Sequence, residues 1–248
     1  MCAKHQHGLF CNSPVRRNFL KIAVSSTALE IFGGGFLLGH ARAGALTKAQ
    51  RDQMSPEQII AAAKRGNERF RSGVRKSRNY LNEQKASASG QYPAAVPLSC
   101  IDSRAPAEVI MDLGLGDIFN CRVAGNISNQ DILGSMEFAC KLAGAKVVLV
   151  MGHTACGAIK GAIDNVELGN LTGLLDKIKP AVQATSFSGE RSSKNYAFVD
   201  AVARTNVQMT VDNIRKNSAV LAELERSGTI KITGAMYNLD TGALEFFS

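Results

Sequence analysis

Three short runs of apolar residues, separated by segments of helical periodicity, constrain the fold of this 248-residue chain more than any other feature. The runs cover residues 94–100, 117–123 and 146–151, and the last contains four aliphatic residues in succession. Between the second and third runs, residues 128–142 place apolar side chains at a helical period. Continuous apolar runs are typical of strands that a parallel sheet buries on both faces. The sequence therefore predicts an α/β fold, with a mainly parallel central β-sheet flanked by helices.

The rest of the chain is predicted to add a helical arm before the sheet and an antiparallel hairpin after it. Ser55-Pro56-Glu57-Gln58 combines a helix N-cap, a first-turn proline and a capping-box partner, so a helix is predicted over residues 56–72. The basic, serine-rich residues 71–90 are expected to form a surface loop or arm, which extends the N-terminal helical arm over about residues 55–90. Later elements are predicted as helices at 168–184 and 196–226, the second broken near residue 217, and as a C-terminal hairpin over 229–247.

Residues 1–43 have the organisation of a secretion signal. The pair Arg16-Arg17 is followed by an apolar stretch over residues 22–38 and by Ala41-Arg42-Ala43, a small-x-small cleavage pattern. These features resemble a twin-arginine (Tat) export signal, and the alternative is a disordered amphipathic tail. We therefore expect a signal peptide over 1–43, which the Tat export machinery would recognise, and a mature domain over 44–248.

A permanent membrane anchor is not expected in this leader. Glu30 divides its apolar stretch into two uncharged runs of eight residues, whereas about 20 apolar residues are needed to cross a bilayer. The expected location is therefore periplasmic or secreted, with a mature chain that starts near Gly44.

The charge and the cysteines argue against two classes of protein. The net charge of +8 falls to +4 without residues 1–43, and no basic stripe with interleaved aromatics is present, so a nucleic-acid partner is not expected. Six cysteines in a chain of this size do not indicate a disulfide framework. Cys121 and Cys140 are interpreted as small buried apolar residues. The mature domain keeps one histidine, His153.

Two separate positions at the ends of predicted strands carry metal-binding side chains. Cys100 ends the first strand, and His153 and Cys156 follow the third strand within Gly-His-Thr-Ala-Cys-Gly. Because the carboxyl ends of parallel strands meet at one edge of a sheet, these side chains are expected to converge. Two sulfurs and one nitrogen suit Zn²⁺, and three protein ligands leave the fourth tetrahedral position open, as in a catalytic site. His-x-x-Cys alone would be a weak signal, and its placement strengthens it.

The residues that follow Cys100 make the signal more specific. Cys100-Ile101-Asp102-Ser103-Arg104 places a thiol, a carboxylate and a guanidinium within five residues. Cys-x-Asp-x-Arg, followed about fifty residues later by Gly-His-x-x-Cys-Gly, resembles the zinc site of the β-class carbonic anhydrases. The resemblance extends over roughly residues 55–248. In one departure, Arg122-Val123-Ala124-Gly125-Asn126 lacks the first Asn of the family's Arg-Asn-x-(Ala/Gly)-Asn.

The resemblance implies a zinc enzyme, with one Zn²⁺ per chain, that hydrates carbon dioxide reversibly to bicarbonate and a proton. It implies that Asp102 accepts a hydrogen bond from the attacking hydroxide and that Arg104 holds Asp102 away from the metal. It also implies a homodimer or a higher homo-oligomer. The implied substrate pocket contains Gln91, Phe119, Ala124, Phe138 and Gly157.

Two other functions fit the same motifs. A protein of the β-carbonic anhydrase type, with the same metal and fold, can hydrolyse carbonyl sulfide or carbon disulfide. A non-catalytic zinc-binding protein that senses bicarbonate is the second alternative, and the intact pair of Asp102 and Arg104 argues against it. A purely structural zinc normally has four protein ligands, so it is the weakest alternative.

Overall fold

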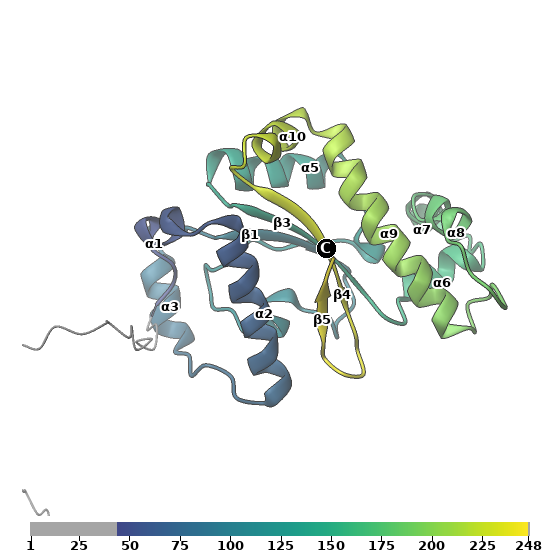
Figure 1. Cartoon of the computed structure of the whole chain (residues 1–248), viewed down its shortest axis with the longest axis horizontal. Coiled ribbons are helices and arrows are strands. Elements are labelled where there is room, and N and C mark those ends of the chain that lie inside the picture. Colours follow the sequence, from purple (N-terminus) through teal and green to yellow (C-terminus); the bar gives the residue numbers. More distant parts are fainter. Residues whose placement is uncertain (1–43, 248) are drawn as a thin grey trace, which may run out of the picture. The chain divides into compact units, whose positions relative to one another are not determined.

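The computed structural model describes residues 44–247, which form a five-stranded sheet in the order β2-β1-β3-β4-β5. Strands β1 to β4 pair in parallel, and β5 is antiparallel to β4 (Figure 1). The strands are β1 (Ala95–Ser99), β2 (Cys121–Arg122), β3 (Val147–His153), β4 (Lys231–Tyr237) and β5 (Leu244–Phe246). The predicted fold class, a mainly parallel sheet flanked by helices and closed by an antiparallel pair, is confirmed.

The middle strand, β3, is buried at all seven positions. Val148 and Val150 belong to the hydrophobic cluster on one face of the sheet, whereas Val147, Leu149 and Met151 belong to the cluster on the other face. Because both faces are covered, an apolar side chain is favoured at every position and not only at alternate ones. This packing explains the uninterrupted aliphatic sequence of the strand.

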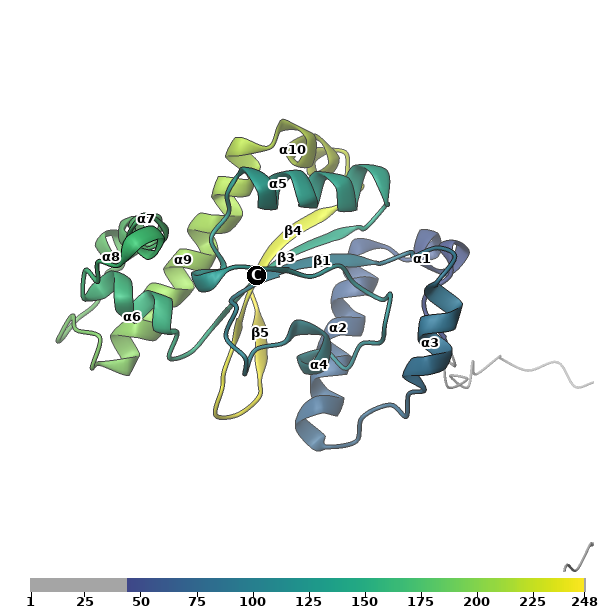
Figure 2. The same cartoon turned by 180° about the vertical axis from the view of Figure 1, so that it is seen from behind.

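Helices cover both faces of the sheet (Figures 1 and 2). On one face, α2 (Pro56–Ser72) and α4 (Ala107–Ile110) contribute apolar side chains, and on the other α5 (Gln130–Glu137), α9 (Tyr196–Asn217) and α10 (Ala219–Arg226) do so. The other helical elements are α1 (Lys48–Gln53), α3 (Tyr80–Ser87), α6 (Gly157–Ile163), α7 (Gly169–Asp176), α8 (Lys179–Ala184), a 3₁₀ turn at Ala124–Asn126 and a π-helical turn at Phe138–Leu142.

Helix α2 has the ends that its sequence predicts. The Ser55 hydroxyl accepts a hydrogen bond from Gln58 N at 3.2 Å, and the Gln58 side chain accepts one from Ser55 N at 2.9 Å. The helix ends at Gly73, whose φ of 72° is the left-handed conformation that glycine adopts without strain. The predicted helix over residues 56–72 is therefore confirmed.

The sequence predicts a loop or arm after α2, and the structure shows that part of this segment is helical. Asn79 caps α3 by accepting a hydrogen bond from Asn82 N at 3.0 Å. Glu83, on the same helix, is buried and pairs with Arg78 at 3.2 Å. A buried ion pair therefore fixes a helix for which the local sequence has no amphipathic pattern.

Two other predicted elements differ from the structure. The run over residues 117–123 is a strand only at Cys121–Arg122, because β2 lies at the edge of the sheet and has β1 as its single neighbour. The predicted helix over residues 168–184 is divided into α7 and α8, and Pro180 in the first turn of α8 lacks the N–H that a continuous helix would use. The predicted break between α9 and α10 is confirmed at Ser218, which caps α10.

The predicted signal peptide, residues 1–43, lies outside the residues that the structure describes. Within residues 44–247, none of the helices combines the length and the apolar character needed to cross a membrane.

Candidate metal centre

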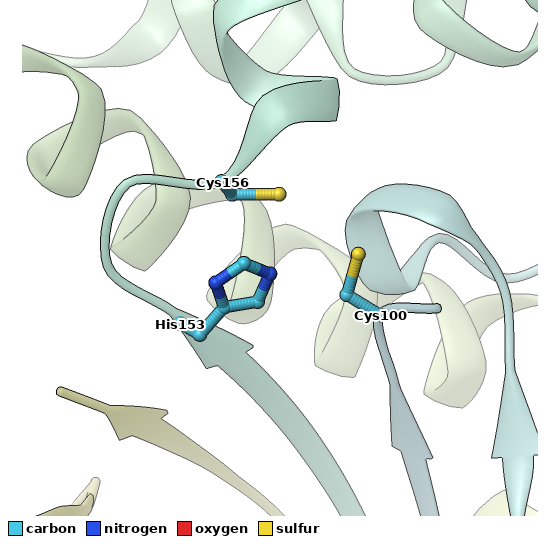
Figure 3. Close-up of side chains that lie close together, drawn as sticks. All are labelled: Cys100, His153 and Cys156. Atoms are coloured by element: carbon cyan, nitrogen blue, oxygen red, sulfur yellow. The ribbon is translucent and has the colours of Figure 1, made fainter. Parts of the chain in front are cut away.

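The three residues predicted as metal ligands meet at the carboxyl edge of the sheet. Strand register sets this meeting, since Ser99 of β1 pairs with Met151 of β3 and both ligand segments follow directly. Cys100 comes directly after β1, His153 is the last residue of β3, and Cys156 is the N-cap of α6. Their ligand atoms all lie within 4.8 Å of one another, and all three residues are buried (Figure 3). This geometry suits a single ion of the size of Zn²⁺.

The imidazole of His153 is oriented to bind a cation. Its Nδ1 lies 2.9 Å from the carbonyl oxygen of Thr154, so Nδ1 carries the proton and donates it. Its Nε2 is buried and has no hydrogen-bond partner among residues 44–247. Buried polar atoms without a partner are rare in folded proteins, and a lone pair that faces two sulfur atoms is the arrangement of a metal ligand. The residues therefore fit a bound zinc ion.

The protonation of the three ligands is coupled. A hydrogen bond from Cys156 lowers the pKa of Cys100 against the effect of burial. The same contact, together with burial, raises the pKa of Cys156. Burial acts to lower the pKa of His153, but the adjacent Cys100 outweighs this effect and raises that pKa. Full ligation requires two thiolates and a neutral imidazole, so an incoming Zn²⁺ must displace protons.

Asp102 and Arg104 form a rigid pair beside the cluster. The Arg104 side chain donates from Nε to Asp102 Oδ1 at 3.0 Å and from Nη2 to Oδ2 at 2.8 Å. The backbone N of Arg104 also donates to Oδ1, at 2.9 Å. Hydrogen bonding to Arg104 holds the pKa of Asp102 well below its usual range, so the carboxyl is ionised. Asp102 Oδ2 lies 3.9 Å from His153 Nε2. An ionised acceptor therefore stands at the edge of the space that a metal would occupy.

Further side chains fix the segment that carries Cys100, and sequence reasoning did not assign them a role. Arg122 donates from Nε to the carbonyl oxygen of Cys100 at 2.9 Å and from NH2 to that of Asp102 at 2.6 Å. Gly125 N donates to Cys100 Sγ at 3.4 Å, and Asn206 of α9 donates to Gly125 O at 2.8 Å. Val123 stands where the family motif has its first Asn, and none of these contacts uses the side chain of residue 123.

Gly125 cannot be replaced by a larger residue at this position. Its φ is 69°, and a Cβ there would lie 2.5 Å from Ile178 Cδ1. The close approach lets the backbone N–H at residue 125 reach the sulfur of Cys100.

The structure gives a position to each of the five residues predicted for the substrate pocket. Gly157 directly follows Cys156, and Ala124 precedes Gly125, so these two adjoin the cluster. Phe119 and Phe138 form an edge-to-face pair, 6.2 Å between ring centroids, and line a groove of about 620 Å³ beside β2 and α5. None of the three metal-ligand residues lines that groove. Gln91 is exposed ahead of β1.

Comparison with known proteins identifies the family. The family model described as carbonic anhydrase matches residues 95–244, more than half of the chain. The chain belongs to the carbonic anhydrase family. The matched region contains Cys100, His153, Cys156, Asp102 and Arg104, and begins after the helical arm.

Individual carbonic anhydrases show the extent of the similarity. Carbonic anhydrase 2 of Mycobacterium tuberculosis is 34% identical over 194 residues, which cover 76% of this chain and 91% of the relative. The carbonic anhydrase of Mycolicibacterium smegmatis is 33% identical over 196 residues, 78% of this chain and 94% of the relative. The solved structure of the β-carbonic anhydrase CafA of Aspergillus fumigatus is 26% identical, with a TM-score of 0.59 over 77% of this chain and 91% of CafA. This chain therefore has the β-class fold.

Proposed function

We propose that this protein hydrates carbon dioxide reversibly to bicarbonate and a proton, with one zinc ion held by Cys100, His153 and Cys156. The observation that carries the proposal is the unpartnered Nε2 of His153, which faces two buried sulfurs and lies 3.9 Å from the ionised Asp102. The names of the relatives support the same reaction, since they are carbonic anhydrases.

Each residue of the centre has a distinct task in this reaction. The three ligands hold the metal, which, when bound, acts as a Lewis acid that makes a water molecule nucleophilic near neutral pH. Asp102 accepts a hydrogen bond from the attacking oxygen and orients its lone pair toward the carbon of CO₂. Arg104 holds both oxygens of Asp102, so that the carboxylate acts as an acceptor and does not itself become a ligand.

The proposal is tested by stopped-flow CO₂ hydration on purified protein, with bound zinc measured on the same sample. We expect one zinc per chain and fast hydration that is lost when zinc is removed and restored when it is added back. A zinc-loaded protein that does not hydrate CO₂ at neutral or alkaline pH would contradict the proposal. Assays of carbonyl sulfide hydrolysis and of bicarbonate binding would then distinguish the two alternative functions.

Zinc affinity is expected to fall as the pH decreases through neutrality. The pKa of His153 is raised above its ordinary value of about 6.5, so protons compete for the ring already above that pH. The raised pKa of Cys156 acts in the same direction, because its thiol must lose a proton to bind zinc. Competition with a chromophoric chelator, repeated across a pH series, measures the effect. An affinity that does not change between pH values on the two sides of neutrality would contradict this ligand set.

We propose further that the protein is exported by the twin-arginine route and is processed near Gly44. Replacement of Arg16 and Arg17 by lysine is expected to leave the full-length precursor in the cytoplasm, because the pair is the recognition element of such signals. Cell fractionation and the intact mass of the protein measure location and cleavage. Lys21→Arg, an equally conservative exchange at a neighbouring basic residue, is the control and should be exported. Normal export of the double-lysine variant would contradict the proposed route.

We propose that the chain forms a homodimer or a larger homo-oligomer through the edge of the sheet at β2. Phe138, which lines the groove beside β2, and Leu142 of the same π-helical turn are 52% and 76% exposed, and the edge strand has an unpaired side among the described residues. Exposed apolar side chains next to an unpaired strand favour association. The solution mass from light scattering is expected to be at least twice that of the chain, and Phe138→Glu is expected to lower it. A monomeric wild-type protein at micromolar concentration would overturn this proposal.

A further inference from the structure

The turn that joins the second and third metal ligands contains a strained residue. Ala155 lies between His153 and Cys156 and has a φ of 53°. Within residues 44–247, the other non-glycine residues with positive φ are Asp112, Asn126 and Asn165. Asp and Asn tolerate the left-handed region because their short polar side chains can bond to the nearby backbone. Alanine has no such group, so an interaction from outside the turn must hold Ala155 in this conformation.

That interaction comes from Asp200 on α9. Asp200 Oδ1 accepts a hydrogen bond from Ala155 N at 2.8 Å, across 45 residues of sequence. Among the described residues, Asp200 makes this side-chain hydrogen bond with the ligand turn, and the charge of Lys160 also acts on its carboxylate. Asp200 is half-buried. Its carboxylate binds the turn that carries the ligands.

The sheet fixes one end of this turn and helix α6 fixes the other. The backbone conformation of Ala155 therefore determines the relative positions of His153 and Cys156. His153 is held in the sheet by its pairing with Tyr237, and Thr154 N donates to Tyr237 O at 3.0 Å. Cys156 is the N-cap of α6, so its position is tied to the start of that helix. Between these two rigid elements, the backbone rotation at residue 155 sets the direction in which Cys156 Sγ points relative to His153 Nε2.

We propose that Asp200 is a positioning residue of the metal centre: it holds Ala155 in the left-handed conformation and so keeps His153 and Cys156 at the spacing that binds one ion. The inference rests on the proposed zinc site and adds to it a contact from helix α9. Without an acceptor at residue 200, Ala155 would relax toward the right-handed or extended regions that alanine prefers, and the two ligands would separate.

Three variants test this role. Asp200→Ala removes the acceptor, Asp200→Asn keeps an oxygen that can accept the same bond, and Asp200→Ala combined with Ala155→Gly removes the strain that the bond offsets. Asp212→Ala is the matched control, because Asp212 lies on the same helix with its side chain 61% exposed and pairs with Arg215. Zinc affinity is measured by chelator competition, the geometry of the centre by the visible spectrum of the Co²⁺-substituted protein, and folding by circular dichroism.

The expected result is a graded loss of zinc binding. Asp200→Ala should weaken zinc binding by about tenfold and alter the Co²⁺ spectrum, because the turn loses a hydrogen bond that offsets left-handed strain. Asp200→Asn should retain most of the affinity, the double variant should recover most of it, and Asp212→Ala should match the wild type. Recovery by Ala155→Gly is the decisive readout, since a general role of Asp200 in folding would not be restored by glycine at residue 155.

Several results would overturn the inference. Equal zinc affinities of Asp200→Ala and Asp212→Ala would do so, as would a loss that neither asparagine at 200 nor glycine at 155 restores. The inference would also be overturned if Asp200→Ala does not fold and Ala155→Gly does not restore its folding. Failure of the wild-type protein to bind zinc would instead overturn the proposed function and remove the basis of the inference.

Discussion

Cys156→Ala is expected to abolish zinc binding and CO₂ hydration together. The substitution removes one of three ligands, and the remaining pair, Cys100 and His153, cannot complete a tetrahedral site. Because a zinc ion held by these ligands would supply the nucleophile at neutral pH, kcat/KM should fall by at least about three orders of magnitude. Zinc content and stopped-flow hydration are measured on the same preparation, so that the loss of metal and the loss of activity can be compared directly.

Cys140→Ala is the matched control for this experiment. Cys140 is also a buried cysteine, 4% exposed, and burial raises the pKa of its thiol to about 12. It lies in the π-helical turn after α5, and no part of it belongs to the metal-ligand cluster. The control should keep zinc and activity and lose at most about 1–2 kcal/mol of stability, as a small truncation in a packed core does. Retention of one zinc per chain by Cys156→Ala would show that the ligand set is wrong.

The sheet and the ligands could be predicted because their signals are local. Strand β3 is buried on both sides, so its whole sequence is apolar and can be recognised without any partner. His153 and Cys156 stand three residues apart at the turn from this strand into a helix, and Asp102 and Arg104 stand two and four residues after Cys100. Each of these patterns fits within a few residues, which is the range that sequence reasoning can use.

The contacts that hold the ligand segments in place could not be predicted in the same way. Asp200 bonds to Ala155 across 45 residues, and Asn206 bonds to Gly125 across 81. A single polar residue on a long helix resembles an ordinary surface residue, and its target is a backbone atom that leaves no pattern in the sequence. Both contacts exist because α9 crosses the carboxyl edge of the sheet, which is a property of the tertiary fold.

Helix α3 was missed for a related reason. Its segment is polar and basic, so local periodicity does not indicate a buried face. Its helical conformation is supported by the buried pair of Glu83 with Arg78, and Glu83 also accepts a hydrogen bond from Leu115 N at 3.0 Å. Tertiary burial of one carboxylate thus outweighs the local preference for a loop.

Arg104→Ala is expected to differ from Cys156→Ala in its zinc content: zinc stays bound while the activity falls. The substitution removes both side-chain hydrogen bonds to Asp102 and leaves the one from the backbone N of residue 104. The freed Asp102 Oδ2 starts 3.9 Å from His153 Nε2, and an aspartate oxygen is a competent zinc ligand. The carboxylate should therefore turn to the metal and close the open position, with kcat/KM lower by about 10²-fold at neutral pH.

Two further variants separate this mechanism from a general loss of charge. Arg104→Lys keeps the charge but cannot form the two parallel hydrogen bonds of the guanidinium, so its activity should lie between those of the wild type and Arg104→Ala. Arg226→Ala removes an exposed arginine of α10 that pairs with Glu223 on the same helix. This control should change neither the zinc content nor the hydration rate. The Co²⁺ spectrum of Arg104→Ala should report a fourth protein ligand. Unchanged hydration by Arg104→Ala would mean that the pair of Asp102 and Arg104 takes no part in the reaction.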